Sequence, residues 1–512
     1  MVWQPDKPQR PEVEKIRFEV VPYVHGRALD VSAGGAKAFP NMISVGRFPE
    51  ANVIDFPEKV ECFAPELFDC VFSSHCLDKV EDPAAALRRW WELLKVGGYL
   101  VLYLHHRDHF PRVGLTGSRF DQKNDFVNED VIDLMARVGN WDLAENQLRT
   151  EGDEYSFLQV YRKRAAGTGN TESWEDPKPE KTAAIVRLGA YGDAIWASSI
   201  TSHLKEQGYH VTVYTQECGE TMLRSDPNTD RIIVVSDYLV QNHELVGYVL
   251  GESVKYDRFI NLMESVEVQF LPHPASTRFY WPDDRRRDRM NKNYLEEIHD
   301  WAGLPHDFRQ RFYPTAEERA WAEAERAKYV GPVVCVCPSG SSTPKWWPYT
   351  GEFMKLLADR SIHCFAFGAM RQEPANIPET YGHMVGMDWP IRKAMAFAQL
   401  ADVVVGTETG VLNAVAFESM LKIVFLSHSS PENLTKHWVN TIEVQPTGLD
   451  CYPCHRIHAH WHFCTRDRVT MAAACQAVAR PEMIAAAVFE YLKPEQAALV
   501  PEPQESMDAA HV

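Results

Sequence analysis

Residues 183–196 read Ala183-Ala-Ile-Val-Arg-Leu-Gly-Ala-Tyr-Gly-Asp-Ala-Ile-Trp196. An apolar, partly β-branched run passes into a short glycine-containing loop, and an amphipathic helix follows. The same order recurs after Ala28–Val31 and after Val333–Cys337. Strands that alternate with helices favour parallel sheets covered on both faces. We therefore predict an α/β protein with three doubly wound domains, whose ligands bind where the strands end.

The domain organisation follows from length and from one break in composition. A chain of 512 residues is long enough for roughly two to four domains. Ala165–Glu180 lacks apolar periodicity and is rich in Gly, Thr, Asn, Pro and Glu, which is typical of a linker. The predicted parts are a first domain at 1–163, a linker at 164–180, two further domains at 181–328 and 329–498, and a flexible tail at 499–512.

Charge and hydropathy limit the partners. With 71 acidic and 53 basic side chains the formal net charge is −18, which disfavours nucleic acid as a partner. No apolar stretch approaches the roughly 18–20 residues that a membrane-spanning helix needs, and the N-terminus has no apolar signal core. We expect a cytoplasmic protein without a membrane span. The sequence is compatible with a homo-oligomer and does not decide the oligomeric state.

The first domain carries the run Ala28-Leu-Asp-Val-Ser-Ala-Gly-Gly-Ala36, followed downstream by Phe68–Pro83 and Leu94–Tyr103. In order and spacing these segments resemble the first, fourth and fifth strands of class I S-adenosylmethionine (SAM)-dependent methyltransferases. The resemblance implies a methyltransferase-like fold. It also implies that Asp30, Gly34 and Gly35 are what remains of a SAM site.

The second predicted strand departs from that family. It normally ends in an acidic residue that holds the cofactor ribose, but here Gly46 or Arg47 stands at that position. Loss of a charge-assisted, two-pronged hydrogen bond weakens binding by about a few kcal/mol. One interpretation is a domain that no longer methylates and serves packing or acceptor recognition. The alternative is a SAM-dependent methyltransferase, or a bifunctional methyl and glycosyl transferase, that acts on a glycan.

The segment Tyr103-Leu-His-His-Arg-Asp-His-Phe110 is expected to follow the fifth strand of this domain. Three histidines and an arginine after a strand end suit the rim of a binding site. A structural role for these side chains is the alternative.

The run at 183–196 resembles the opening of family 9 glycosyltransferases, the ADP-heptose heptosyltransferases of GT-B architecture with two Rossmann-like halves. Arg187, Gly192 and Asp193 match that family's Arg-x-x-x-x-Gly-Asp loop, and the resemblance implies that Arg187 and Gly192 help to bind the donor. The resemblance implies that Asp193 is the general base, because a sugar hydroxyl is a weak nucleophile that needs a proton acceptor. Such an attack inverts the anomeric centre. The alternative is that Asp193 only caps a helix.

A donor half is predicted from Val333-Val-Cys-Val-Cys-Pro-Ser-Gly-Ser-Ser-Thr-Pro-Lys-Trp-Trp-Pro348. The segment resembles the strand, small-residue loop and Lys-x-Trp-Pro element of family 9. At Ser339 and Gly340 backbone N–H groups could approach a diphosphate, to which Lys345 would supply a positive charge. A solvated lysine in an ordinary turn is the alternative.

A second donor element is Val403-Val-Val-Gly-Thr-Glu-Thr-Gly410, a predicted strand and loop before a helix. Glu408, Thr409 and Gly410 fall on the family's Asp-Thr-Gly positions, whereas Asn413 replaces its histidine. A helix N-terminus is a favourable seat for a diphosphate. The implied donor is ADP-heptose or a close nucleotide-diphosphate sugar, and the acceptor hydroxyl is left open between a glycan, a protein and a small molecule. A sugar-nucleotide-binding scaffold is the non-enzymatic alternative.

Four of the eleven cysteines lie close together in sequence: Cys451, Cys454, Cys464 and Cys475. Four thiolates suit a tetrahedral Zn or Fe ion, and a closed site of this kind is structural. Some heptosyltransferases have a related Cys-x-Pro-Cys segment, and a protein-modifying subset uses four such cysteines for iron. Disulfide pairing and plain packing are the alternatives. The nearby histidines could replace Cys475 as ligands: His455, His458, His460 and His462.

Overall fold

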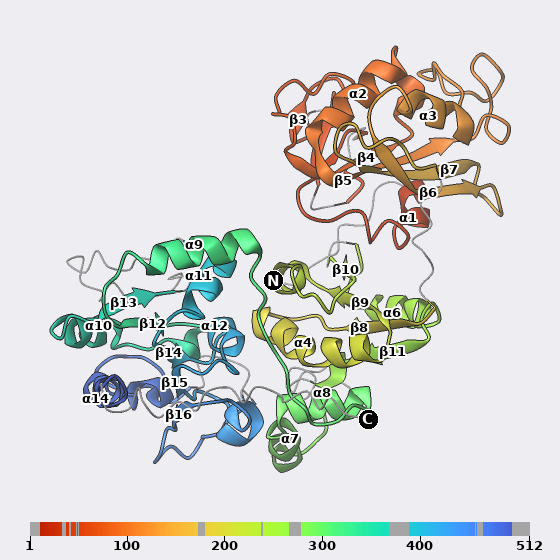
Figure 1. Ribbon diagram of the computed structural model, residues 1–512. Coiled ribbons are helices and arrows are strands. Elements are labelled where there is room, and N and C mark those ends of the chain that lie inside the picture. The colour runs from red at the N-terminus through yellow and green to blue at the C-terminus, as the bar shows by residue number, and fades with distance from the viewer. Residues whose placement is uncertain are drawn as a thin grey trace, which may run out of the picture. The chain divides into compact units, whose positions relative to one another are not determined.

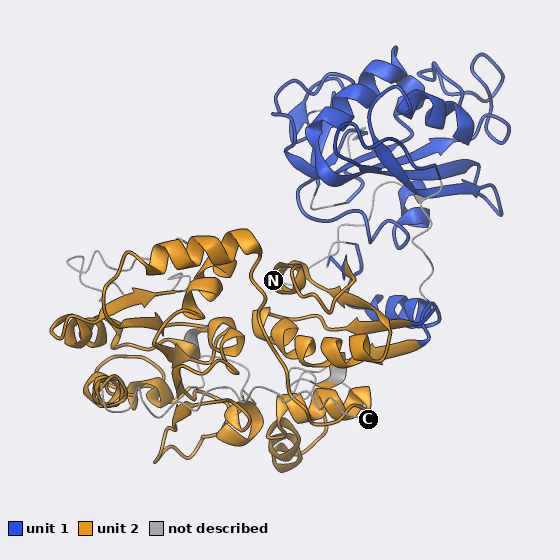
Figure 2. Ribbon diagram, in the orientation of Figure 1, with its two compact units in different colours: residues 1–181, 233–257 blue, residues 182–232, 258–512 orange. Residues whose placement is uncertain are grey.

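The structure is a computed structural model. It describes residues 11–32, 37–39, 42–47, 49, 51–172, 180–236, 239–265, 278–340, 342–367, 389–455, 457 and 464–493. Several predicted features lie outside these ranges: Gly34, Gly35, His458, His460, His462, residues 173–179 of the linker, and the tail at 499–512. The chain forms two compact units, Met1–Lys181 with Ile233–Asp257, and Thr182–Ile232 with Arg258–Val512 (Figure 2).

The first unit is built on a seven-stranded sheet in the order β3-β2-β1-β4-β5-β7-β6 (Figure 1). Its strands are β1 (Ala28–Asp30), β2 (Ile43–Gly46), β3 (Val53–Ile54), β4 (Phe68–Ser74), β5 (Leu94–His105), β6 (Trp141–Arg149) and β7 (Ser156–Lys163). The pairings from β3 to β5 are parallel, whereas β7 runs antiparallel to both β5 and β6. The central strands read as continuous apolar runs because both faces of a parallel sheet are covered.

The helices of this unit are α1 (Pro11–Ile16), α2 (Pro83–Leu93), α3 (Asn128–Met135) and α6 (Leu245–Ser253), with a short 3₁₀ helix η1 (Leu77–Lys79). Helix α2 begins at Pro83 because the Asp82 side chain accepts a hydrogen bond from the Ala85 amide. It buries Trp90 and Trp91 against the sheet. Helix α6 joins the unit through a hydrogen bond of 2.7 Å from Arg17 to the carboxylate of Glu244.

The second unit contains two sheets in the orders β10-β9-β8-β11 and β13-β12-β14-β15-β16. The strands of the first are β8 (Thr182–Val186), β9 (His210–Thr215), β10 (Arg231–Val234) and β11 (Arg258–Asn261). Those of the second are β12 (Val333–Cys337), β13 (His363–Ala366), β14 (Val403–Thr407), β15 (Leu421–Phe425) and β16 (Thr441–Val444). The pairings within the second sheet are parallel.

The helices that accompany the first of these sheets are α4 (Tyr191–Glu206), α5 (Glu217–Leu223), α7 (Asp283–Met290) and α8 (Tyr294–Ala302). Those of the second are α9 (Ala316–Arg326), which lies beside α11 in Figure 1, α10 (Thr350–Ala358), α11 (Ile391–Ala398), α12 (Gly410–Ala414), α13 (Ala474–Ala477) and α14 (Pro481–Tyr491). Arg392 in α11 is buried between the two halves. Its guanidinium donates to the Glu318 carboxylate at 2.8 Å and to the backbone carbonyl of Thr221 at 2.6 Å. These bonds hold the two sheets of this unit together.

The predicted fold class is confirmed, because each of the three quoted runs forms a strand with parallel neighbours in a sheet of its own: β1, β8 and β12. The start of the predicted linker packs back on the first unit, since the Thr171 amide donates to the Trp141 carbonyl at 2.9 Å and its carbonyl accepts from Leu143 at 3.0 Å. In the part of the chain that is described, no helix is long and apolar enough to cross a membrane.

Candidate functional site

Asp193 lies in the first turn of α4, immediately beyond the glycine loop that follows β8. Its Oδ2 accepts a hydrogen bond of 2.7 Å from the Ala190 amide, and its Oδ1 accepts one of 2.5 Å from Arg187 Nη2. The first bond satisfies an N–H group at the start of the helix, as the capping alternative expects. The side chain is nevertheless 24% exposed, so the same carboxylate can also meet a ligand.

Arg187 is the buried partner that orients this carboxylate. Its side chain is 1% exposed and also donates to the Leu262 carbonyl at 3.1 Å. Gly189 permits the close approach of the loop, since it has a φ of +150° and a Cβ there would lie 2.8 Å from Asp193 Cγ. In this structure Arg187 positions Asp193, whereas the sequence analysis assigned it to donor binding.

Two glycines bring the Asp193 loop into contact with the other half of the unit. A Cβ on Gly410 would lie 2.8 Å from the Tyr191 Cβ, and a Cβ on Gly192 would lie 3.1 Å from Asn413 Nδ2. The contact is fastened by Trp196 Nε1, which donates to Asn413 Oδ1 at 2.6 Å. The loops after β8 and β14, predicted from separate motifs, therefore touch.

The loop after β12 joins the same place. Lys345 Nζ lies 3.4 Å from Glu408 Oε2 and donates to the Glu408 carbonyl at 3.2 Å. A Cβ on Gly340 would lie 2.7 Å from Lys345 Cδ, so the loop that begins at Ser339 closes tightly on the lysine. The structure brings together the two predicted donor segments, 333–348 and 403–410, at Lys345 and Glu408.

The Glu408 carboxylate is 4% exposed and is surrounded by hydrogen-bond donors. It accepts bonds from the amide and hydroxyl groups of Ser427 and Ser429, at 2.7–3.3 Å. Burial alone would raise its pKa, but His428, Lys345 and these amides lower the pKa to about 2. Ser427–Ser429 are not among the predicted site residues, although a polar run after a buried strand is a signal that a sequence can give.

Thr409 caps the short helix that follows it. Its hydroxyl accepts a bond of 3.4 Å from the Leu412 amide at the start of α12. That helix runs from Gly410 to Ala414. A single helical turn aligns few peptide dipoles, so its attraction for a diphosphate is weaker than that of a long helix.

The cysteine segment borders this site. The His455 amide donates to the His428 carbonyl at 2.9 Å, and Arg287 in α7 donates to the Pro453 carbonyl at 2.8 Å. Burial raises the pKa of the Cys475 thiol, and the charges of Cys454, Glu408, Cys464 and Cys451 raise this pKa further. Among the residues described, no three His, Cys, Asp or Glu side chains converge closely enough to hold a metal ion. Cysteine thiolates are ligands that Zn and Fe prefer, but the described residues do not form a complete coordination geometry.

In the first unit, Asp30 ends β1 and is fully buried. Its Oδ1 accepts from the Ser32 amide and hydroxyl at 2.9 and 2.7 Å, and its Oδ2 accepts from the Ala38 amide at 2.7 Å. The Ser32 hydroxyl in turn accepts from the Ser74 amide at 2.9 Å. This carboxylate holds its own turn against the end of β4.

Comparison with known proteins agrees with this architecture in part of the chain. Residues 29–102 match the family described as a methyltransferase domain. No curated protein matches the chain in sequence.

Solved structures similar to the chain include three glycosyltransferases. One is a glycosyl transferase family 9 protein from Veillonella parvula, with 13% identity over 61% of this chain and 97% of that chain and a TM-score of 0.43. Another is the ADP-heptose lps heptosyltransferase II of E. coli, with 13% identity over 62% and 99% and a TM-score of 0.43. The third is the dodecameric iron-containing heptosyltransferase TibC, with 13% identity over 63% and 79% and a TM-score of 0.41.

The end of β2 in the first unit is where the family's ribose-binding carboxylate would stand. The strand ends at Gly46, and the following Arg47 lies over the Phe56 ring at 4.7 Å. Asp55 donates its amide to the Gly46 carbonyl at 3.2 Å, and its carboxylate oxygens accept from the amides of Phe56 and Glu61. Among the described residues at this strand end, the Asp55 carboxylate is thus bonded to its own loop, and no acidic side chain follows Gly46 directly.

The predicted rim of this domain needs a correction. Strand β5 extends to His105, so Tyr103 and His105 lie within the strand and are buried instead of following it. Only the residues after His105 continue into the more exposed segment that leads to Phe126.

Proposed function

We propose that this protein is an inverting glycosyltransferase that moves a sugar from a nucleotide-diphosphate donor to an acceptor hydroxyl. The observation that carries the proposal is the contact between the Asp193 loop and the loop of Glu408 and Gly410. A partly exposed carboxylate, oriented by a buried arginine, follows a loop that packs against the segment of Gly410, and Glu408 in that segment contacts Lys345. The likeness of these motifs to heptosyltransferases favours ADP-heptose as the donor.

The chain's own groups account for the transfer as follows. Lys345 and the backbone at Ser339 and Gly340 bind the donor diphosphate and offset its charge. The acceptor oxygen attacks the anomeric carbon while the bond from that carbon to the diphosphate oxygen breaks, and the nucleoside diphosphate leaves. Asp193 takes the hydroxyl proton as the new bond forms. Arg187 holds the carboxylate in place, and Glu408 holds Lys345.

A donor screen by thermal shift over nucleotide-diphosphate sugars, followed by mass spectrometry of the products, tests the function. With the best donor, Asp193→Asn should lower kcat by about 10²–10⁴-fold and leave donor affinity unchanged, because the variant keeps the size of the side chain and loses the proton acceptor. The matched control is Asp300→Asn, at an exposed carboxylate of the same unit. Near-normal turnover of the Asp193 variant would contradict the proposal.

Labelled SAM tests the methyl-transfer alternative, for which we expect no label on the acceptor.

We also propose that Cys451, Cys454, Cys464 and Cys475 hold a structural Zn or Fe ion. The grouping of the four thiols around Cys475 and the tetrahedral preference of both ions for sulfur support this. When bound, the ion would cross-link the segment next to His428. Elemental analysis of protein purified without a polyhistidine tag should give about one equivalent of metal per chain. Cys454→Ser should lose it, whereas Cys364→Ser, on β13, should keep it.

A further inference from the structure

Asn413 lies where the two loops of the proposed transfer site meet. It belongs to α12 and is 5% exposed. Its Oδ1 accepts a hydrogen bond of 2.6 Å from Trp196 Nε1, and its Nδ2 donates one of 2.9 Å to the Thr409 carbonyl. An indole N–H only donates and a carbonyl only accepts, so these two partners fix the orientation of the amide. One buried side chain therefore bonds α4 of the first half to the donor loop of the second.

The same side chain borders the residue that precedes the proposed base. A Cβ on Gly192 would lie 3.1 Å from Asn413 Nδ2, so the backbone there passes close to the amide. Gly192 is followed directly by Asp193 in the first turn of α4. The position of the Asn413 side chain therefore limits where the backbone before Asp193 can lie.

Trp196 is itself held in place. It is 8% exposed, and its ring stacks on that of Tyr294 with 4.1 Å between centroids. The guanidinium carbon of Arg187, which orients Asp193, lies 5.9 Å from the centre of the Trp196 ring. An aromatic face attracts a guanidinium at about this distance. Trp196 thus borders both the amide of Asn413 and the arginine that holds the base.

The backbone of Asn413 is fixed as well. Its amide donates to the Thr409 carbonyl at 3.0 Å, and its carbonyl accepts from Gln310 Nε2 at 2.9 Å. Gln310 lies between α8 and α9 and is 2% exposed. The Thr409 carbonyl thus accepts from two groups of one asparagine. If Thr409 shifts, it must move Asn413 with it or leave buried polar groups without partners, which is costly.

We propose that Asn413 is a positioning residue that holds the Asp193 loop in register with the donor loop at Thr409. Through Gly192 and Trp196 it fixes the carboxylate relative to the bound donor, without touching either reacting group. This inference rests on the proposed glycosyl transfer for its catalytic consequence, whereas the positioning itself can be tested without a substrate.

Hydrogen exchange of the full-length protein tests the positioning. Asn413→Leu keeps the approximate size of the side chain and removes both of its hydrogen bonds, and Trp196→Phe removes one donor from a buried ring. In each variant the amides of residues 187–196 should exchange about tenfold faster or more, as expected when a buried hydrogen bond is lost. Unchanged exchange of this segment in a folded variant would overturn the proposal, and one variant suffices if the other fails to fold.

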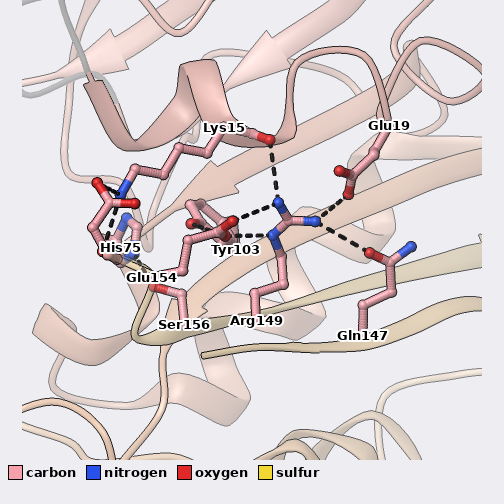
Figure 3. A network of polar contacts seen from close by, with 9 residues as sticks. Lys15, Glu19, His75, Tyr103, Gln147, Arg149, Glu154 and Ser156 are labelled. Carbon is pink, nitrogen blue, oxygen red and sulfur yellow. Dashed lines mark hydrogen bonds and ion pairs between the residues drawn. The ribbon is translucent and has the colours of Figure 1, made fainter. Parts of the chain in front are cut away.

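Tyr103→Phe is the matched control, because it also removes one donor from a buried aromatic ring. Tyr103 belongs to a network of the first unit, in which it donates to Glu154 at 3.4 Å and Arg149 donates to the same carboxylate at 2.6 Å (Figure 3). This variant should leave the exchange of residues 187–196 unchanged. Faster exchange of that segment in Tyr103→Phe would show that it responds to any loss of stability, and would overturn the assignment to Asn413.

The catalytic consequence is measured with a donor that the wild type turns over. Asn413→Leu and Trp196→Phe should each lower kcat about tenfold or more and change donor affinity less than about twofold, because the base is displaced while the donor loop remains. The double variant should lose no more than Asn413→Leu alone, since that variant already lacks the bond from Trp196. Losses that multiply would overturn the proposal. A wild type that turns over no nucleotide sugar would contradict the proposed function, and the exchange result would still decide whether Asn413 positions the loop.

Discussion

Asp30 and Asp193 occupy similar positions in their two units, yet their surroundings differ. In the sequence, Asp30 ends an apolar strand and glycines follow it, whereas Asp193 comes after an apolar strand and a glycine-containing loop. Asp30 is fully buried and accepts three hydrogen bonds from Ser32 and Ala38 in its own turn. Asp193 is about a quarter exposed and keeps one oxygen on Arg187 and the other on the Ala190 amide.

The difference shows that a strand, a carboxylate and glycines do not by themselves define a reactive group. What separates the two is whether donors within the local turn enclose the carboxylate. Asp30 is enclosed, so its role is to hold the turn. Asp193 comes directly after Gly192, in the loop that contacts Gly410. Part of the Asp193 carboxylate stays exposed. The following predictions test this contrast.

The largest expected effect comes from separating the two loops of the second unit. Gly410→Ala would place a Cβ 2.8 Å from the Tyr191 Cβ, so the Asp193 loop must shift. A displacement of about 1 Å at a catalytic group costs about 100-fold in rate. We expect kcat/KM for glycosyl transfer to fall by that order. Gly247→Ala in α6, where a Cβ meets no atom within 4 Å, is the control and should keep full activity.

A stability effect is expected for Asp30→Asn in the first unit. The amide group cannot accept all three bonds, so a buried N–H of Ser32 or Ala38 loses its acceptor, at a cost of about 2 kcal/mol. Hydrogen exchange of the β1 and β4 amides in the full chain measures the loss. Glycosyl transfer should be unchanged. Equal exchange rates in wild type and variant would show that Asp30 does not stabilise this turn.

The fold class could be predicted from the sequence because three strand-glycine-helix openings each specify a local parallel unit. The meeting of Lys345 and Glu408 was also foreseeable, since β12 and β14 are neighbours whose ends share an edge of one sheet. The burial of Arg187 was not, because its second partner, the Leu262 carbonyl, is distant in sequence. For the same reason the sequence did not reveal that Ser427 and Ser429 saturate Glu408.

The end of β5 shows another limit of sequence reasoning. A basic and aromatic run suggests a loop, but pairing with β7 extends the strand as far as His105, opposite Ser156. The side chains of Tyr103 and His105 then enter the interior. Pairing with a strand so far along the chain cannot be read from local composition, because β propensity depends on the neighbours that a strand meets.

The smallest effect concerns Glu408, a carboxylate that is enclosed like Asp30 but lies beside Lys345 in the proposed donor site. Its pKa of about 2 lies below the ordinary value of 4.5, so folding favours the charged form. The resulting stability is present above pH 4.5 and is lost as the pH falls toward 2.

Glu408→Gln lacks this titration. The stability difference between wild type and variant should therefore narrow by about 1 kcal/mol when the pH falls by about one unit below 4.5. Thermal unfolding of both proteins at several pH values measures this difference in stability. Glu92→Gln, at an exposed site, is the control. A stability difference that does not change with pH would mean that the neighbours of Glu408 do not hold it ionised.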